Sequence, residues 1–158
     1  MQSLWELGDA HEQHDLDLLV LADSQAIDGL TASLSSCSIR INEQWAEANP
    51  MTKGRVTRFA SAEHPKYPLD IIYAADFQER ATIERKRLTM VHGLSVWVAS
   101  PEDLMLLKLK AGRPTDFDDV IGIVKNPRLQ LDLPYLWNWA DRLGLHGELH
   151  YVLQAAGG

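Results

Sequence analysis

The feature that most constrains this chain is an apolar run that begins with two aspartates. Residues 14–23 read HDLDLLVLAD, so Asp15 and Asp17 lie at the start of an unbroken apolar segment. A short, continuous apolar run is typical of a strand that is buried on both faces, and we expect such a strand at 15–22. Side chains two positions apart on a strand project from the same face. The two carboxylates are therefore expected side by side, where uncompensated charge near a core is costly.

A hard cation is one way to compensate the charge of this pair. Magnesium prefers oxygen ligands and usually takes one or two carboxylates together with the phosphates of a substrate. Asp15 and Asp17 are therefore candidate ligands of Mg²⁺ or Mn²⁺. The alternative is that both lie at an exposed end of the strand and are simply hydrated.

A third carboxylate, Asp70, lies in the second strongly apolar segment, LDIIYA. If this strand neighbours the first, Asp70 joins the pair, and three carboxylates on adjacent strands can hold two metal ions for in-line attack on a phosphoryl group. The alternative for Asp70 is an ion pair with Arg58 or Lys66.

A second group of charged residues lies in LLKLKAGRPTDFDD, residues 106–119. Lys108 falls on the apolar stripe of a predicted helix, where a lysine must reach solvent or an anion. Asp116, Asp118 and Asp119 fall in the first turn of the next helix, where the helix dipole by itself favours negative charge. The functional alternative is that Lys108 reaches nucleotide phosphates and that Asp116 orients it or binds the nucleotide.

The order of the predicted elements indicates an α+β protein. SPED at 100–103 is a helix start, with Ser100 as N-cap and Pro101 at the first helical position, and Gly112 ends that helix. We expect a small mixed sheet within residues 1–99 and a helical region, 100–158, packed on it. The expected strands are 15–22, 55–61, 67–75 and 94–100. The expected helices are 3–11, 24–35, 76–87, 101–111 and 117–126, followed by one that opens at Asp132 and Pro134 and one over 148–155. Residues 37–48 read as a strand and a short helix.

Composition narrows the class of protein. A formal net charge of −7 argues against a general electrostatic grip on nucleic acid. The single cysteine excludes an internal disulfide and fits a reducing compartment. The N-terminus has no basic segment followed by an apolar one, and no apolar stretch approaches the roughly 20 residues of a membrane span. We therefore expect a cytoplasmic protein without a membrane partner.

Three segments together resemble the nucleotidyltransferase fold of the polymerase-beta type. They are DLDLLV, LDII and SPEDLMLLKLKAGRPTDFDDV, and the resemblance covers roughly residues 4–125. Within that superfamily the chain is similar to the AbiEii and AbiGii type of abortive-infection toxin nucleotidyltransferases. The pattern PEDL followed by KL, AGR and two spaced aspartates is the most specific part, because a D-x-D motif alone is weak.

The resemblance implies a role for each candidate residue. Asp15 and Asp17 match the magnesium ligands of the family, and Asp70 matches a third carboxylate found in many members of the wider fold. Lys108 matches the family lysine, and Asp116 matches the later aspartate. The implied reaction transfers a nucleotide from a magnesium-bound nucleoside triphosphate to a hydroxyl of an RNA such as transfer RNA, a protein or a small molecule, with release of pyrophosphate. A toxin-type enzyme also implies a cognate antitoxin as partner.

The chain departs from the family pattern before its first strand. Members carry a Gly-Gly or Gly-Ser turn whose backbone amides hold the triphosphate, and no such turn precedes Asp15 at the required distance. Gly8 is the only glycine there, and we expect the first strand and this turn to be missing. Two interpretations follow: an enzyme, or a degenerate nucleotidyltransferase-like domain that binds a partner without catalysis.

Overall fold

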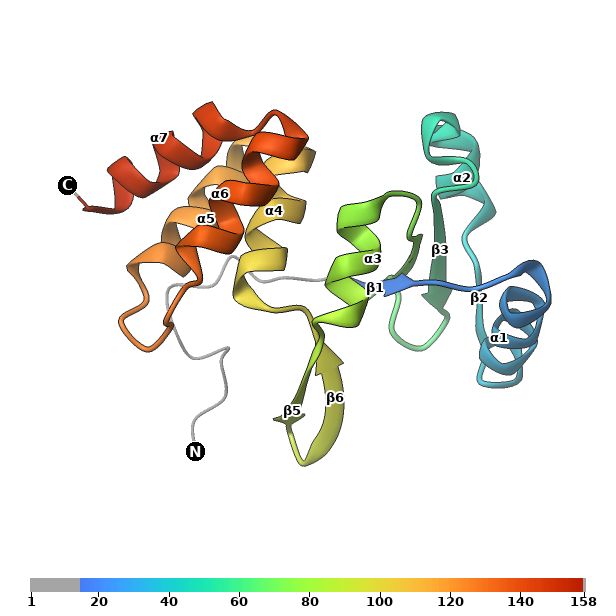
Figure 1. The fold of residues 1–158 in the computed structure, drawn as a ribbon. Helices are drawn as coiled ribbons and strands as arrows, with labels where there is room; N and C mark the ends of the chain where they lie inside the picture. The colour runs from blue at the N-terminus through green and yellow to red at the C-terminus, as the bar shows by residue number, and fades with distance from the viewer. Residues whose placement is uncertain (1–14, 158) are drawn as a thin grey trace. The chain divides into compact units, whose positions relative to one another are not determined.

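A computed structural model describes residues 15–157, which form two compact units, 15–83 and 84–157 (Figure 1). The chain is α+β, as predicted, with a mixed sheet in the first unit and helices toward the C-terminus. The helix predicted at 3–11, together with Gly8, lies outside the described residues. The unit boundary precedes residues 84–99, so these residues group with the helices, whereas the sequence-based division at 99/100 assigned them to the first part.

The first unit is built around a four-stranded mixed sheet with the order β1–β4–β3–β2. β1 (Leu16–Val20) runs parallel to β4 (Leu69–Tyr73), whereas β3 (Val56–Ser61) is antiparallel to both β4 and β2 (Ile39–Ile41). Phe59 on β3 and Ile71 on β4 are fully buried. The helical elements of this unit are α1 (Ser24–Ser36), α2 (Glu43–Ala48), the 3₁₀ turn η1 (Pro50–Thr52) and α3 (Phe77–Glu84).

The exposure of β1 differs from the prediction. A strand forms where the apolar run predicts one, but it is not buried on both faces, because Leu16 is 59% and Leu18 is 41% exposed. The physical reason is its position: among the described strands β1 pairs only with β4 and therefore lies at the edge of the sheet. A continuous apolar run does not distinguish a central strand from an edge strand.

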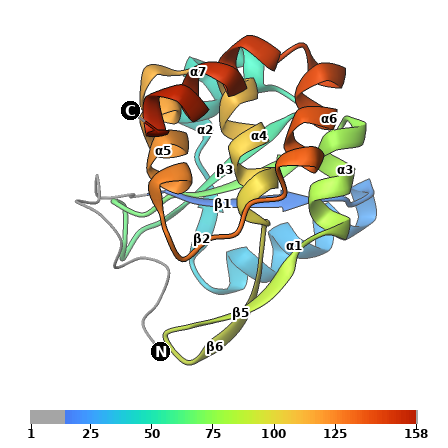
Figure 2. The same ribbon diagram turned by 60° about the vertical axis from the view of Figure 1, so that its left-hand side comes forward.

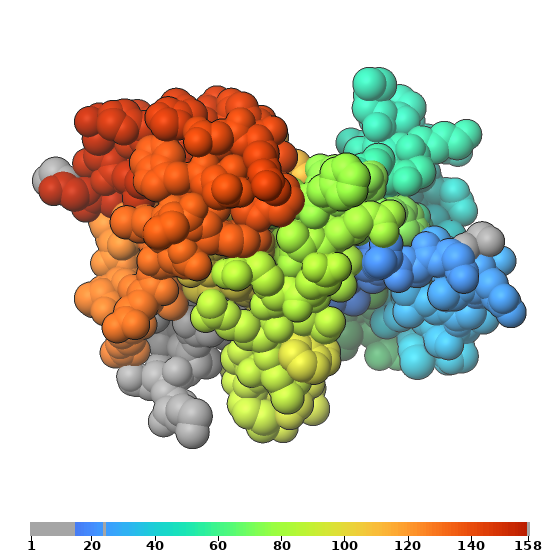
Figure 3. Space-filling model, in the orientation of Figure 1, coloured from blue at the N-terminus to red at the C-terminus, as the bar shows by residue number. Residues whose placement is uncertain are grey.

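The second unit combines a hairpin with four helices. β5 (Arg87–Val91) and β6 (Leu94–Val98) are antiparallel, and they form a protrusion of exposed side chains in the space-filling view (Figure 3). The helices α4 and α7 each pack against both α5 and α6, and the four stay side by side when the view is turned (Figure 2). Their bounds are Pro101–Ala111 for α4, Pro114–Lys125 for α5, Leu133–Leu143 for α6 and His146–Gly157 for α7. The buried core of the bundle consists of Met105, Leu106, Leu109, Val120, Leu136, Ala140, Leu149 and Val152.

Local sequence signals explain where α4 begins and ends. Ser100 Oγ accepts a hydrogen bond from the backbone N–H of Asp103 at 3.1 Å, and Pro101 is the first helical residue, as predicted. Gly112 ends the helix with a φ of +67°, a conformation that glycine adopts without the steric cost of a side chain. Among the described residues no helix is long and apolar enough to span a bilayer.

Two expectations about helix ends were wrong. The helix predicted over 76–87 ends at Glu84, and the next residues turn into β5, which the sequence did not predict. His92 and Gly93 both have positive φ, as a two-residue type I′ hairpin turn requires. The helix predicted at 117–126 begins earlier, because Pro114 occupies its first turn.

Candidate functional site

Strand register brings three of the predicted site residues together in the first unit. Asp17 on β1 is the register partner of Asp70 on β4, and Asp70 is the register partner of Arg58 on β3. Register partners on neighbouring strands project from the same face, and Asp15, two positions before Asp17, projects with them. We call the surface formed by Asp15, Asp17, Asp70 and Arg58 the carboxylate face.

Arg58 is the centre of the hydrogen bonds on the carboxylate face. Its Nε donates to Asp70 Oδ1 at 2.7 Å, and its Nη2 donates to Asp70 Oδ2 at 2.7 Å and to Asp15 Oδ2 at 3.0 Å. The fork-to-fork geometry with Asp70 is the strong, bidentate form of a guanidinium–carboxylate pair. Hydrogen bonding to Asp70 raises the pKa of the Arg58 guanidinium. The ion pair weighed as the alternative for Asp70 is therefore present, and Asp15 shares it.

A tryptophan that the sequence did not single out holds the guanidinium from one side. Trp45 is on α2, and Arg58 Cζ lies 4.7 Å from the centre of its ring, within the range of a cation–π interaction. The Arg58 side chain is 20% exposed, so contacts rather than water surround most of it. The sequence offered Arg58 only as one alternative partner of Asp70, and nothing in the sequence pairs Trp45 with it.

The carboxylate oxygens of the carboxylate face are ligands of the chemical type that divalent cations prefer. Two carboxylate oxygens, one from Asp15 and one from Asp70, converge on the single atom Nη2 of Arg58. Mg²⁺ prefers such oxygen donors and commonly takes two protein carboxylates. Within residues 15–157 the structure presents no group of three or more His, Cys, Asp or Glu side chains that could hold a metal ion. A metal at this face would thus have Asp15 and Asp70 as ligands in the place that Arg58 takes in this structure.

The other two predicted site residues lie together in the helical unit. Lys108 Nζ is 2.5 Å from Asp119 Oδ2 and 3.8 Å from Asp116 Oδ1, so its closer carboxylate is Asp119. Asp116 is buried and is bound chiefly by Arg113. The Arg113 side chain donates to it from Nε at 2.8 Å and from Nη2 at 3.0 Å, and the backbone N–H donates at 3.1 Å. Burial raises the pKa of the Asp116 carboxyl, but hydrogen bonding from Arg113 outweighs this effect and holds the pKa below its usual value.

These contacts give Asp116 a structural task at the start of α5. Its side chain caps the backbone N–H of Arg113, one of the amides that a helix cannot satisfy internally. Lys108 neutralises both nearby carboxylates and is 20% exposed. The predicted site thus comprises two groups in different units: Asp15, Asp17 and Asp70 on the sheet, and Lys108 with Asp116 in the bundle.

The PEDL segment contributes two buried charged residues, Glu102 and Asp103, for which the sequence pattern predicted no contact with α6. Asp103 accepts a hydrogen bond from Tyr135 Oη at 2.6 Å, and Glu102 accepts one from the backbone N–H of Asp132 at 3.0 Å, so both tie α4 to the start of α6. Burial raises the pKa of the Glu102 carboxyl, but hydrogen bonding, chiefly from this backbone N–H, outweighs this effect and lowers the pKa. Arg85 Cζ lies 3.8 Å from the centre of the Tyr135 ring. The same guanidinium forms ion pairs with Glu102 and Asp103. In this structure the two acidic residues of PEDL connect α4 with α6.

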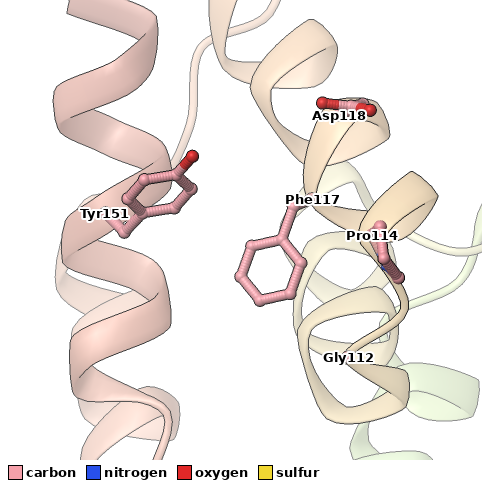
Figure 4. Close-up of a pocket in the computed structure, with 5 residues that line it drawn as sticks. All are labelled: Gly112, Pro114, Phe117, Asp118 and Tyr151. Carbon is pink, nitrogen blue, oxygen red and sulfur yellow. The ribbon is translucent and has the colours of Figure 1, made fainter.

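A groove of the helical unit is lined by residues other than the predicted ones. Phe117 on α5 and Tyr151 on α7 point toward one another across it, with ring centres 6.0 Å apart and planes at 70° (Figure 4). Gly112, Pro114 and Asp118 complete its lining. None of Asp15, Asp17, Asp70, Lys108 and Asp116 lines this groove.

Comparison with known proteins adds no assignment. No protein-family model matches the chain, and a search of curated proteins finds no significant match. The case for a function therefore depends on the two groups of residues described above.

Proposed function

We propose that this protein is a nucleotidyltransferase-like enzyme that transfers a nucleotide from a magnesium-bound nucleoside triphosphate to an acceptor hydroxyl. The observation that carries the proposal is the register pairing of Asp17 with Asp70, with Asp15 two residues away on the same face. Carboxylates gathered on adjacent strands are the arrangement that binds divalent cations and, through them, phosphates. The resemblance of the sequence to the polymerase-beta type of nucleotidyltransferase supports the same reading.

Each residue has a defined task in this proposal. The resemblance assigns the metal to Asp15 and Asp17, and the oxygens that converge in the structure are those of Asp15 and Asp70. A Mg²⁺ or Mn²⁺ ion bound there would neutralise phosphate charge and polarise the phosphoryl group. Asp70 also accepts the proton of the attacking hydroxyl, whose oxygen forms a bond to the α-phosphorus as pyrophosphate leaves. The resemblance alone assigns neutralisation of phosphate charge to Lys108. Asp116, whose Oδ1 is 3.8 Å from Lys108 Nζ in the same unit, limits the positions which that amine can take.

The acceptor and the partner are proposed from the resemblance alone. The acceptor hydroxyl belongs to an RNA such as transfer RNA, to a protein or to a small molecule. An enzyme of the toxin type would also bind a cognate antitoxin, and co-purification with the product of a neighbouring gene is the observation that supports this.

A second candidate function is a degenerate, non-catalytic domain that binds a partner. The observation that favours it is the Arg58 side chain, which already compensates the charge of Asp15 and Asp70 without a metal. In a site that has lost catalysis, a guanidinium is a stable substitute for a metal cation, because it forms bidentate pairs with carboxylates.

A labelling experiment separates the two candidates. The protein is incubated with Mg²⁺ or Mn²⁺, each α-³²P nucleoside triphosphate, and bulk transfer RNA or the protein itself as acceptor. Transfer of label that is lost in Asp17→Asn and kept in Asp28→Asn supports the enzyme, since Asp28 is an exposed aspartate of α1 with the same charge. Equal transfer by Asp17→Asn and wild type would contradict the enzyme, and absence of label with every acceptor favours the partner-binding domain.

A further inference from the structure

Arg58 stands where the proposed function needs a metal. Its Nη2 contacts oxygens of both Asp15 and Asp70, at 3.0 and 2.7 Å, and its Nε contacts the second oxygen of Asp70 at 2.7 Å. A divalent cation bound between these same two oxygens would occupy the position of Arg58 Nη2. Binding of metal in that position therefore requires the Arg58 guanidinium to move away from it.

Arg58 is held in this place by more than the two carboxylates. The Trp45 ring lies against the guanidinium, 4.7 Å from Cζ, and only 20% of the side chain is exposed. Asp70 is 8% exposed, so it would be left as a nearly buried charge if the arginine moved away and nothing replaced it. The ion pairs of Arg58 with Asp15 and Asp70 are thus expected to persist until another cation binds the two carboxylates.

A guanidinium displaced by a metal has a natural second partner at this site. Guanidinium groups bind phosphate oxygens through the same planar fork with which they bind carboxylates. A metal-bound triphosphate would bring phosphate oxygens to the side chain that the metal has displaced. One arginine can then neutralise carboxylates in the free protein and phosphates in the loaded protein.

We propose that Arg58 exchanges partners in this way: it is the counter-ion of Asp15 and Asp70 in the metal-free protein and a ligand of the polyphosphate once a divalent cation is bound. This inference rests on the proposed function and deepens it. It makes Arg58 a competitor of the metal alone and a helper of the metal–polyphosphate complex. Removing Arg58 should therefore move the two affinities in opposite directions.

The test measures both affinities in the same set of variants. Mn²⁺ alone is titrated by the electron paramagnetic resonance signal of the free ion, and preformed Mn²⁺–tripolyphosphate is titrated by calorimetry, which makes the result independent of the base. The variants are Arg58→Gln, Trp45→Leu and the control Lys53→Gln. Lys53 is an exposed lysine of the same unit, so its substitution removes one positive charge and leaves the carboxylate face intact. Circular dichroism and a thermal melt verify the fold of each variant.

We expect Arg58→Gln to bind Mn²⁺ about tenfold more tightly than wild type, because a competitor that fills most of the sites lowers the apparent affinity by that factor. The same variant should bind Mn²⁺–tripolyphosphate about tenfold more weakly. Trp45→Leu keeps Arg58 but removes the aromatic ring that lies against its guanidinium, so this variant should tighten Mn²⁺ binding by a smaller factor. This variant keeps the test decisive if Arg58→Gln does not fold. Lys53→Gln should change either affinity by less than about twofold.

Three results overturn the inference. Unchanged Mn²⁺ affinity in Arg58→Gln and Trp45→Leu shows that Arg58 does not compete with metal. Tighter binding of both Mn²⁺ and Mn²⁺–tripolyphosphate shows that it competes but never turns to phosphate. In both cases binding by wild type leaves the proposed function standing. If neither the wild type nor any variant binds Mn²⁺ or its tripolyphosphate complex, the proposed function and this inference fail together.

Discussion

Asp70 on β4 and Arg58 on β3 are register partners joined by two hydrogen bonds of 2.7 Å. This pair sits at the centre of the sheet, since β4 and β3 are its two inner strands. It connects the stability of the first unit with the chemistry proposed for it, because the same carboxylate is both half of an ion pair and a candidate metal ligand.

The ion pair should be measurable as a coupling between the two residues. Arg58→Gln should lower the free energy of unfolding by about 2 kcal/mol, because hydrogen bonds to charged groups contribute roughly 1.5–3 kcal/mol. Asp70→Asn should also destabilise, and the double variant should lose less than the sum of the two single losses. Urea unfolding, followed by circular dichroism, supplies the double-mutant cycle. Additive losses would show that the pair contributes no specific interaction energy.

The hydroxyl of Tyr135 should stabilise the helical unit through Asp103. Tyr135→Phe leaves the buried Asp103 carboxylate without the donor at 2.6 Å, and we expect a loss of about 1–2 kcal/mol. Tyr151→Phe is the matched control, because its side chain is exposed and the substitution keeps the ring that faces Phe117. Its effect should stay within about 0.5 kcal/mol. Equal effects of the two substitutions in thermal melts would contradict the structural task assigned to Asp103.

Some of these features were readable from the sequence, and they are the local ones. Ser100 as N-cap, Pro101 in the first turn and Gly112 at the end of α4 are all confirmed. Asp132 caps α6, as its place before Pro134 predicts. Such signals can be read because a cap acts on backbone amides within three or four residues along the chain.

The errors concern arrangement across strands and between distant segments. The apolar run at 15–22 predicts a strand correctly but cannot show that β1 lies at the edge of the sheet. Arg58 appeared only as one of two alternative partners of Asp70, because strand register decides which basic residue lies opposite. The contact of Trp45 with Arg58 depends on how α2 returns to the sheet, which no local pattern encodes.

The sequence predicted part of the arrangement of these residues. Alternation along a strand put Asp15 and Asp17 on one face, and Asp70 joins them because β4 neighbours β1, which was the condition of that prediction. The sequence also paired Lys108 with Asp116, whereas the closest carboxylate to Lys108 Nζ belongs to Asp119, one turn later on α5. Arg113, the main partner of Asp116, was not recognised, because a residue just before a helix proline reads first as a loop residue.

Lys108 should matter for nucleotide binding much more than for stability. Its ion pairs are partly exposed, so Lys108→Gln should change the free energy of unfolding by no more than about 1 kcal/mol. If Lys108 neutralises phosphate charge, the same variant should bind each magnesium–nucleoside triphosphate complex at least about tenfold more weakly. Lys110→Gln, two residues along the same helix, is the control with an equal change of charge. Calorimetry that finds the same affinity in both variants would remove Lys108 from the proposed site.

Asp116 should make the stability of the helical unit sensitive to acid. Its pKa is lowered from the usual 3.8, so the ionised form is favoured in the folded state. The corresponding stability is fully present above pH 3.8 and is lost as the pH falls from 3.8 through the lower folded-state pKa. Asp116→Asn should therefore be less stable than wild type above pH 3.8, and the difference should shrink below it. Asp118→Asn, an exposed neighbour, should follow the wild-type profile in urea unfolding at each pH. A difference between Asp116→Asn and wild type that is constant with pH would contradict this account.

The central claim is that the carboxylate face binds a metal–nucleotide complex, and thermal stability with ligands tests it most directly. Wild type, Asp15→Asn/Asp17→Asn and the control Asp28→Asn/Glu47→Gln are melted with Mg²⁺ and each nucleoside triphosphate; both control residues are exposed, and both doubles remove two charges. A ligand at one hundred times its dissociation constant stabilises the folded state by about 2.7 kcal/mol. We predict a magnesium-dependent rise in melting temperature for wild type and the control, and none for Asp15→Asn/Asp17→Asn. An equal rise in all three proteins, or no rise with any nucleotide, would contradict the claim.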